Sequence, residues 1–348
     1  MQIILRMTTR CNFKCTMCSA SDLSRGTDLS IENIIAILQK YNKQSNNICF
    51  EGGDPLCVKP QLYYDLFERI DNDPSITINE YNFTTNLWDF YKHPNKWVDI
   101  FKRPDVRVCT SFQYGNQRMI TNNKVFDEKI FIEIFEKFEN KVDKKVPFIT
   151  VIDEDNCHSV IQTVKLAQRL DTMCKINPLF MAGRSKSFYR WDHMLKHYCD
   201  IFEAGLEQYE SNCVDIIRMI LGKPMDINCP WVRNCGDKFV VATPDGWLSS
   251  CSIENSTLYN NFYPIKFYDR NNLSNITLDK SRTLISSNCL TCDYFNWCNS
   301  CRVKIGETKS LFNLHNEQNN FCNNINTCVK RLTNFVKHRH ENNPNSPV

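Results

Sequence analysis

Three cysteines lie close together near the start of the chain, and their spacing limits what this region can do. Cys11, Cys15 and Cys18 form a C-x3-C-x2-C run directly behind the apolar stretch 3–5. A closed tetrahedral zinc site takes four protein ligands, and a [4Fe–4S] cluster also takes four, normally cysteine thiolates. Three thiolates on one loop therefore predict a cluster with one iron open to a non-protein ligand. A zinc site completed from elsewhere in the chain, or thiols without a metal, are the alternatives.

The chain has 19 cysteines among its 348 residues, within an otherwise ordinary globular composition of 42% hydrophobic and 23% charged residues. The N-terminus enters an apolar strand without the h-region of a signal peptide. No run approaches the roughly 18 apolar residues that span a bilayer. We therefore expect a cytoplasmic protein without a membrane partner, whose cysteines bind metal rather than form disulfides. The net charge of +3 gives no basis for predicting nucleic acid binding.

Short β-rich runs alternate with amphipathic helical runs over the first half of the chain. Ser30 is expected to cap one helix, and Pro60 suits the first position of the next. Six such strand–helix units predict a parallel sheet wound as a barrel. A full eight-unit barrel needs about 250 residues, whereas the pattern ends near residue 180, so we expect an α/β fold with a partial (β/α)6 barrel. The expected strands are 3–7, 48–51, 81–84, 106–112, 148–152 and 175–180.

The end of the second expected strand resembles a segment of the radical S-adenosylmethionine (SAM) enzymes, whose cluster loop the cysteine run also resembles. The residues are Gly52-Gly53-Asp54-Pro55, similar to the GGE-P segment of that family, with Asp54 in place of the usual glutamate. In the family, SAM occupies the open iron through its amino and carboxylate groups. The resemblance implies that the backbone of 52–55 binds the SAM amino group. Taken without the cysteine loop, the two glycines would suit a simple turn.

The ends of other expected strands add further implied SAM contacts. The third ends in a segment similar to the family's T-N-G, with Leu87 in place of the glycine, and the fourth ends where the family carries ribose and carboxylate contacts. The residue before the third cysteine is commonly aromatic but is a methionine here. The base or hydrogen donor is not identified, and Tyr114, Asp153 and Tyr189 are only candidates by position. The implied SAM contacts are Met17, Gly52, Gly53, Asp54, Pro55, Thr85, Asn86, Ser111 and Gln113.

A second group of cysteines begins at residue 229 and resembles the SPASM extension of radical SAM enzymes, a module that holds two auxiliary [4Fe–4S] clusters. A G-x4-C element from Gly246 to Cys251 fits the small hairpin of that module. Two zinc ions are the alternative, because C-x2-C pairs are common in zinc sites. Spacing favours Cys322 over Cys328 as the last ligand. The resemblance implies Cys229, Cys235, Cys251 and Cys301 for the inner cluster, and Cys289, Cys292, Cys298 and Cys322 for the outer one.

The resemblance also implies a division of the chain and a reaction class. We expect a barrel domain over 1–186, a helical connector over 187–228, a SPASM-like domain over 229–330 and a basic, disordered tail over 331–348. Three [4Fe–4S] clusters and SAM are the expected cofactors, with flavodoxin or ferredoxin as the electron donor. The expected substrate is a peptide or protein. The alternatives are a small molecule such as a sugar, nucleotide or cofactor precursor, and, more remotely, a zinc-binding interaction protein.

Two departures from the pattern of these relatives reduce the range of peptide modifications that we expect. The cluster loop starts at residue 11, so no N-terminal domain that recognises a leader peptide is expected. Ser252 follows Cys251, where anaerobic sulfatase-maturing relatives carry an acidic residue that acts as a base. Sulfatase maturation is therefore not the first choice among peptide modifications.

Overall fold

One eight-stranded sheet forms the centre of the molecule, with the strand order β6-β5-β4-β3-β2-β1-β7-β8. The first six strands are parallel and neighbour one another in chain order, which confirms the predicted partial barrel. The computed structural model describes residues 1–19, 26–41, 46–121, 123–185, 187–224, 229–231, 238–244, 248–249, 251, 289, 291–298, 301 and 318–342. The barrel strands are β1 (Gln2–Thr8), β2 (Asn46–Gly52), β3 (Ile78–Thr84), β4 (Val106–Ser111), β5 (Phe148–Ile152) and β6 (Cys174–Pro178).

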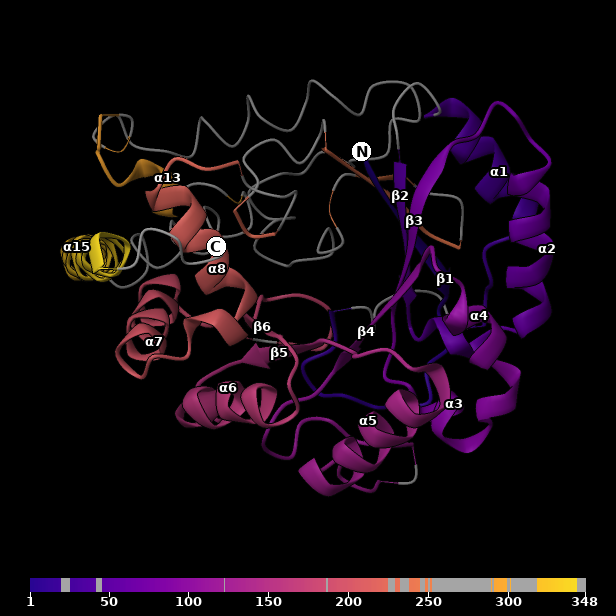
Figure 1. The fold of residues 1–348 in the computed structure, drawn as a ribbon, viewed down its shortest axis with the longest axis horizontal. Helices are drawn as coiled ribbons and strands as arrows, with labels where there is room; N and C mark the ends of the chain where they lie inside the picture. The colour runs from indigo at the N-terminus through magenta and orange to yellow at the C-terminus, as the bar shows by residue number, and fades with distance from the viewer. Residues whose placement is uncertain are drawn as a thin grey trace.

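Helices cover one face of this curved sheet (Figure 1). Ser30 accepts a 3.2 Å hydrogen bond from the Asn33 amide, and Pro60 occupies the first turn of the second helix, as predicted. The buried stripe of that helix contains Tyr63, whereas Leu62, expected on the stripe, is only half-buried. The helices after the strands are α1 (Ile31–Lys40), α2 (Pro60–Asp71), α3 (Trp88–Lys92), α4 (Val98–Lys102), α5 (Glu128–Val142) and α6 (Val160–Arg169).

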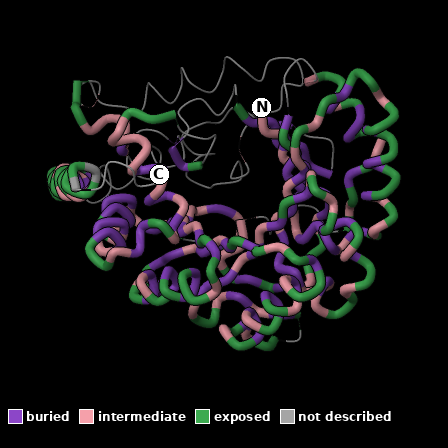
Figure 2. The backbone as a smooth tube through the Cα atoms, viewed as in Figure 1, coloured by how far each residue is buried: buried purple, intermediate pink, exposed green. Residues whose placement is uncertain are grey.

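The two faces of the sheet differ in chemistry. Phe50 and Phe83 pack with ring centroids 4.8 Å apart under the helices, where aromatic side chains fill the core. Successive residues of a strand point to opposite faces, so Glu51 and Thr84 belong to the inner face. There the Arg6 Nε lies 3.6 Å from the Glu51 carboxylate. The inner face of the barrel is therefore polar and carries a shielded ion pair. In Figure 2 the strands are largely buried, and the helices around them expose the sides that face away from the sheet.

The connector after the barrel contains α7 (Trp191–Glu203) and α8 (Ser211–Ile220), as the helical pattern predicted. It also covers the free edge of β6. The Glu210 carboxylate accepts a 2.8 Å hydrogen bond from the Ile176 amide, and Glu210 forms a bridge with Cys174. An uncovered strand edge would leave backbone groups without partners, so this contact closes one side of the open barrel.

The opposite edge of the sheet is extended from the second cysteine region. The predicted hairpin is confirmed as β7 (Phe239–Ala242) and β8 (Leu248–Ser249), paired antiparallel. Unexpectedly, β7 also pairs in parallel with β1, from Gln2 opposite Phe239 to Leu5 opposite Ala242. The hairpin is thus continuous with the barrel sheet rather than part of a detached module.

The C-terminal part of the chain contains α13 (Phe295–Cys298) and α15 (Gln318–Asn342), which lies beside α7 (Figure 1). The predicted boundary between residues 330 and 331 falls inside α15. The basic stretch is therefore helical as far as Asn342, with Leu332 and Val336 buried, rather than a tail. Among the helices that the structure describes, none has the length and apolar character needed to cross a membrane.

Candidate active site

The loop with the first three cysteines leaves the C-terminal end of β1 and is held by two other segments. The Lys14 and Thr16 amides donate to the carbonyls of Met119 and Gln117, at 2.7 and 2.9 Å. Of the three thiols, Cys11 is exposed, Cys15 is buried and Cys18 is half-buried. Met17, the implied adenine contact, is half-buried against the core. The barrel itself therefore fixes the course of this loop.

The loop from residue 179 to 190, after β6, holds the cysteine loop from another side. The Arg184 amide donates to the Cys18 carbonyl at 3.1 Å, and the Arg184 guanidinium donates to the Cys15 carbonyl at 3.3 Å. Gly183 has a φ of +61°, and a Cβ there would lie 2.4 Å from the Cys18 carbonyl oxygen. Neither Gly183 nor Arg184 was expected from the sequence. An isolated glycine beyond the last strand was the only available signal, and nothing local connects it with residue 18.

The Gly52-Gly53 turn lies directly against the root of the cysteine loop. The Gly53 amide donates to the Thr8 carbonyl, and the Asp54 amide to the Arg10 carbonyl, both at 2.8 Å. A Cβ on Gly53 would lie 2.1 Å from the Arg10 oxygen. The second glycine thus permits two protein backbones to approach each other. Its proposed contact with SAM through the backbone stays a prediction.

Asp54 joins the turn after β2 to the turn after β3. Its buried carboxylate accepts hydrogen bonds from the Leu56 amide at 2.9 Å, from the Thr85 hydroxyl at 3.0 Å and from the Asn86 amide at 2.8 Å. Burial raises the pKa of Asp54 to about 6, although these hydrogen bonds favour the ionised form. The side chains of Asp54 and Thr85 therefore serve the scaffold, which leaves the backbone of the following Pro55 and its neighbours for a ligand.

Asn86 reaches the cysteine loop, with its Nδ2 atom 2.6 Å from the Asn12 Oδ1 atom and 3.9 Å from the Cys11 sulfur. Leu87, which replaces the glycine of the T-N-G pattern, has a φ of +57°. The left-handed conformation that a glycine favours is thus kept by a leucine, whose side chain is fully buried. Its burial offsets a backbone strain of about 1–2 kcal/mol.

Several buried polar atoms near the end of β4 make no hydrogen bond to any residue that the structure describes. Ser111 accepts a 2.9 Å hydrogen bond from the Arg118 Nη1 atom. The Arg118 Nε atom and the Gln113 Oε1 atom are buried without a hydrogen bond, and such groups normally find a partner. Arg118 was not expected from the sequence. Residues 117 and 119 bond to the cysteine loop, so the Arg118 Nε–H is a donor close to that loop. Such a donor fits a bound carboxylate, for example that of SAM.

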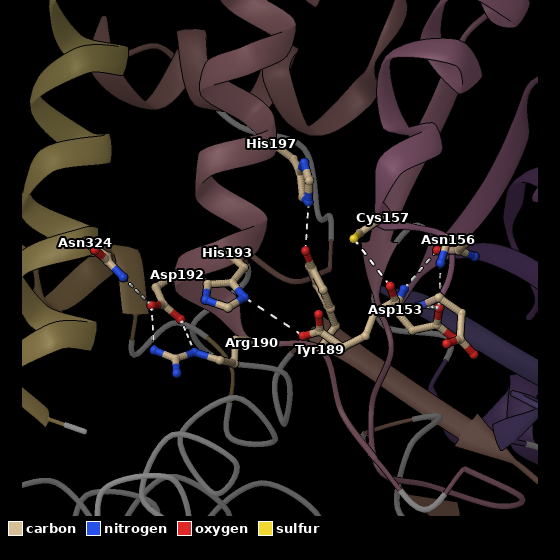
Figure 3. Close-up of polar contacts among 11 residues, drawn as sticks. Asp153, Asn156, Cys157, Tyr189, Arg190, Asp192, His193, His197 and Asn324 are labelled. Atoms are coloured by element: carbon tan, nitrogen blue, oxygen red, sulfur yellow. Dashed lines mark hydrogen bonds and ion pairs between the residues drawn. The ribbon is translucent and has the colours of Figure 1, made fainter. Parts of the chain in front are cut away.

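Figure 3 shows Asp153 and Tyr189, two of the three polar candidates, after the end of β5 and before the start of α7. The Tyr189 hydroxyl lies 2.7 Å from the His197 Nε2 atom, and burial lowers the pKa of His197 to about 4. Asp153 accepts from the Asn156 amide at 3.1 Å. Tyr114 donates to Glu128 at 2.7 Å. Each of these side chains is occupied by local contacts, so none of them stands out as a base or hydrogen donor.

The second cysteine region places its thiols on several separate elements. Cys251 follows β8, and the Cys292 amide donates to the Cys289 carbonyl at 3.2 Å. Cys229 is exposed, Cys298 lies in α13 and Cys301 is buried. Cys235, Gly246 and Ser252 lie outside the described residues.

Cys322 and Cys328, both on α15, occupy different surroundings. Cys322 is exposed, and its thiol pKa is raised by partial burial and by the nearby Cys289 and Cys292. Cys328 is buried and accepts a hydrogen bond from the Cys199 thiol, which lowers the pKa of Cys328. The structure thus groups Cys322 with two other expected ligands of the outer cluster and groups Cys328 with a core cysteine.

Within the residues for which positions are described, no three His, Cys, Asp or Glu side chains converge closely enough to share one metal ion. A [4Fe–4S] cluster makes a different demand, because each thiolate binds a different iron. Three thiols on one loop near Arg118, whose Nε atom has no partner among the described residues, suit such a cluster with SAM.

Comparisons with known proteins agree with this arrangement. Residues 5–167 match the model of the Radical SAM superfamily. No curated protein sequence matches the chain. Among solved structures, native anSMEcpe with bound AdoMet and Cp18Cys peptide is 15% identical, with a TM-score of 0.63 over 94% of this chain and 99% of that chain. Streptococcus suis SuiB bound to the precursor peptide SuiA is 14% identical, with a TM-score of 0.57 over 86% of this chain and 70% of that chain. The match to the Radical SAM superfamily thus covers residues 5–167, and the solved structures share the fold of most of the chain.

Proposed function

We propose that this enzyme modifies a peptide or protein by radical chemistry, with two auxiliary [4Fe–4S] clusters beside the cluster that binds SAM. The observation that carries the proposal is the likeness of fold, over almost the whole chain, to anSMEcpe with a bound peptide and to SuiB with its precursor peptide. The match includes the C-terminal region, where the eight expected auxiliary ligands occur.

When bound, the reduced cluster and SAM supply a 5′-deoxyadenosyl radical that removes a hydrogen atom from the substrate. The chain's own residues bind the cluster and SAM and orient them. Cys11, Cys15 and Cys18 would hold the SAM cluster, and Ser111 with Arg118 would hold the SAM carboxylate through charge-assisted hydrogen bonds. The backbone of 52–55 would hold the amino group, while the contacts of Asp54 keep that turn in place.

The polar inner face of the barrel would receive the substrate. The Arg6–Glu51 ion pair is shielded there, with only 3% of the Arg6 side chain and 24% of the Glu51 side chain exposed. Glu51, the more exposed of the two residues, directly precedes the Gly52-Gly53 turn. Its side chain faces the same side of the sheet as that of Thr84. Such a surface suits the polar groups of a peptide backbone, which must keep hydrogen-bond partners when they leave water.

The test is anaerobic reconstitution followed by reaction with a reductant. We expect about twelve iron and twelve sulfide per chain from three clusters, and formation of 5′-deoxyadenosine. Synthetic peptides encoded by short reading frames beside the gene would then be screened by mass spectrometry for a loss of hydrogen. Flavodoxin or ferredoxin is the electron donor to compare with a chemical reductant.

Zinc in place of iron would refute the cluster assignment. SAM cleavage that is stimulated by a sugar, nucleotide or cofactor precursor, and by none of the peptides, would move the substrate to the small-molecule class.

A further inference from the structure

The loop from residue 179 to 190 bonds directly to the first cysteine region and is linked to the second through Asp192 of α7. Its middle holds the first region, since Arg184 bonds to the carbonyls of Cys15 and Cys18, and Gly183 permits that approach. Within the loop, the Tyr189 amide donates to the Leu179 carbonyl at 2.8 Å, so its two ends are tied together. A shift of the loop backbone near residue 190 would therefore also shift Arg184.

That end of the loop is attached to the second region through a buried carboxylate. Arg190 donates to both oxygens of Asp192, at 3.0 and 2.9 Å, and the Asn324 Nδ2 atom donates to Asp192 at 2.8 Å (Figure 3). Only 1% of Asp192 is exposed. Asn324 stands on α15, two residues after Cys322. A buried charge is tolerated when it is paired and hydrogen-bonded, and here its partners come from the loop and from α15.

We propose that Asp192 is a positioning residue that links α15, and with it Cys322, to the loop that holds Cys15 and Cys18. The inference rests on the proposed function, because it concerns how the SAM cluster loop is kept in place for SAM. Removal of the Asn324 amide breaks the hydrogen bond between Asp192 and α15, and among the described residues Arg190 remains the side-chain partner of Asp192. SAM binding then weakens although every cysteine is still present.

The chain offers a matched control for this contact. Arg331 and Glu203 form another ion pair between α15 and α7, and this pair does not include a residue of the 179–190 loop. Asn324→Ala and Arg331→Gln therefore each remove one contact between the same two helices. Asn324 is exposed, so its replacement leaves the core unchanged. Asp192→Asn is a second variant that keeps the shape of the side chain while removing its charge.

The experiment measures SAM binding by calorimetry on reconstituted, full-length protein, together with iron content and the thermal midpoint. We expect Asn324→Ala and Asp192→Asn to weaken SAM binding about three- to tenfold with iron content unchanged, and Arg331→Gln to stay within about twofold. A role confined to helix packing would lower the thermal midpoint of both α15 variants and leave SAM affinity equal.

Equal SAM affinity in Asn324→Ala and Arg331→Gln, with a wild-type enzyme that binds SAM, would overturn the inference and leave the proposed function intact. A wild-type protein that has its iron and does not bind SAM would overturn both.

Discussion

The two cysteine regions of this enzyme position their thiols in different ways. The first places three cysteines on one loop, and backbone hydrogen bonds from segments 117–119 and 183–184 and from the Gly52-Gly53 turn surround it. The second spreads its thiols over the end of a hairpin, a short helix and the long helix α15. In the first region, protein contacts set the shape that the cluster needs. In the second, ligands far apart in sequence must be brought together, and binding of metal is coupled to that folding.

The contrast does not mean that the regions are independent units. The β7 strand of the second region pairs with β1, and Asn324 bonds to Asp192. These contacts lie away from the cysteine loop itself, at the N-terminal half of β1 and at the start of α7. Loss of one cluster should therefore leave the other site in place, while changes to the shared contacts should affect both regions.

The largest expected effect comes from changing Cys11, Cys15 and Cys18 together to alanine. SAM cleavage should be abolished, because the cluster that binds SAM has no other ligands on this loop. About eight iron per chain should remain from the auxiliary clusters, since β7 pairs only with residues 2–5 of β1. Iron analysis and 5′-deoxyadenosine formation are the measurements. A triple variant that still forms 5′-deoxyadenosine would disprove the assignment of the first region.

The second prediction compares two cysteines on one helix. Cys322→Ala should lose about four iron or become insoluble, because the outer cluster lacks a ligand. Cys328→Ala should keep its iron, since that thiol lies in the core beside Cys199. Iron content after reconstitution separates the two, with the wild type as reference. Loss of iron in the Cys328 variant alone would show that the two roles are reversed.

The third prediction concerns the protonation of Asp54 beside the first region. A folded-state pKa raised from 3.8 to about 6 means that its stabilising effect is present below pH 3.8 and is lost as the pH rises through 6. Between about pH 4 and pH 7 the free energy of unfolding of the wild type should therefore fall by up to about 3 kcal/mol more than that of Asp54→Asn. Urea unfolding of the metal-free proteins measures this difference. Identical pH dependence would mean that Asp54 ionises normally.

The smallest effect is expected from Gly183→Ala, with Gly222→Ala as its control. Both glycines have a positive φ, of +61° and +67°, so both variants carry similar backbone strain of about 1 kcal/mol. The Cβ at Gly183 meets the cysteine loop, whereas no described residue beyond its own neighbours lies within 4 Å of the one at Gly222. SAM affinity should fall about tenfold, or about 1.4 kcal/mol, in the first variant alone. Equal affinities would show that the 179–190 loop does not shape the site.

A related substitution shows how the structure changes an expectation. The sequence alone predicts that Gly53→Val weakens SAM binding and leaves iron content unchanged, because the Gly52-Gly53 turn and the cysteine loop follow different strands. The Cβ would collide with the Arg10 carbonyl at the root of the cysteine loop. Iron content and SAM binding should therefore fall together in this variant.

Much of the barrel could be predicted from sequence because strand and helix periods are local properties. The Ser30 cap, Pro60 and the six strands all follow from patterns within a few residues. The contributions of Arg118 and Arg184 could not be predicted, because nothing in their local sequence indicates their partners. Arg118 donates to Ser111 at the end of β4, and Arg184 bonds to the cysteine loop from 169 residues away. Leu87 shows a different limit, since the left-handed turn of a T-N-G segment is kept by a residue that does not favour it.

The pairing of β7 with β1 also bears on the order in which the protein is made and folded. β1 leaves the ribosome before its partner, which is synthesised more than 200 residues later. One edge of the nascent barrel therefore stays exposed throughout most of translation, and unpaired edges promote association between chains. A contact of such long sequence separation forms slowly. Expression of a fragment that ends before residue 239 would make this exposure permanent, and slower translation would prolong it in the full-length chain.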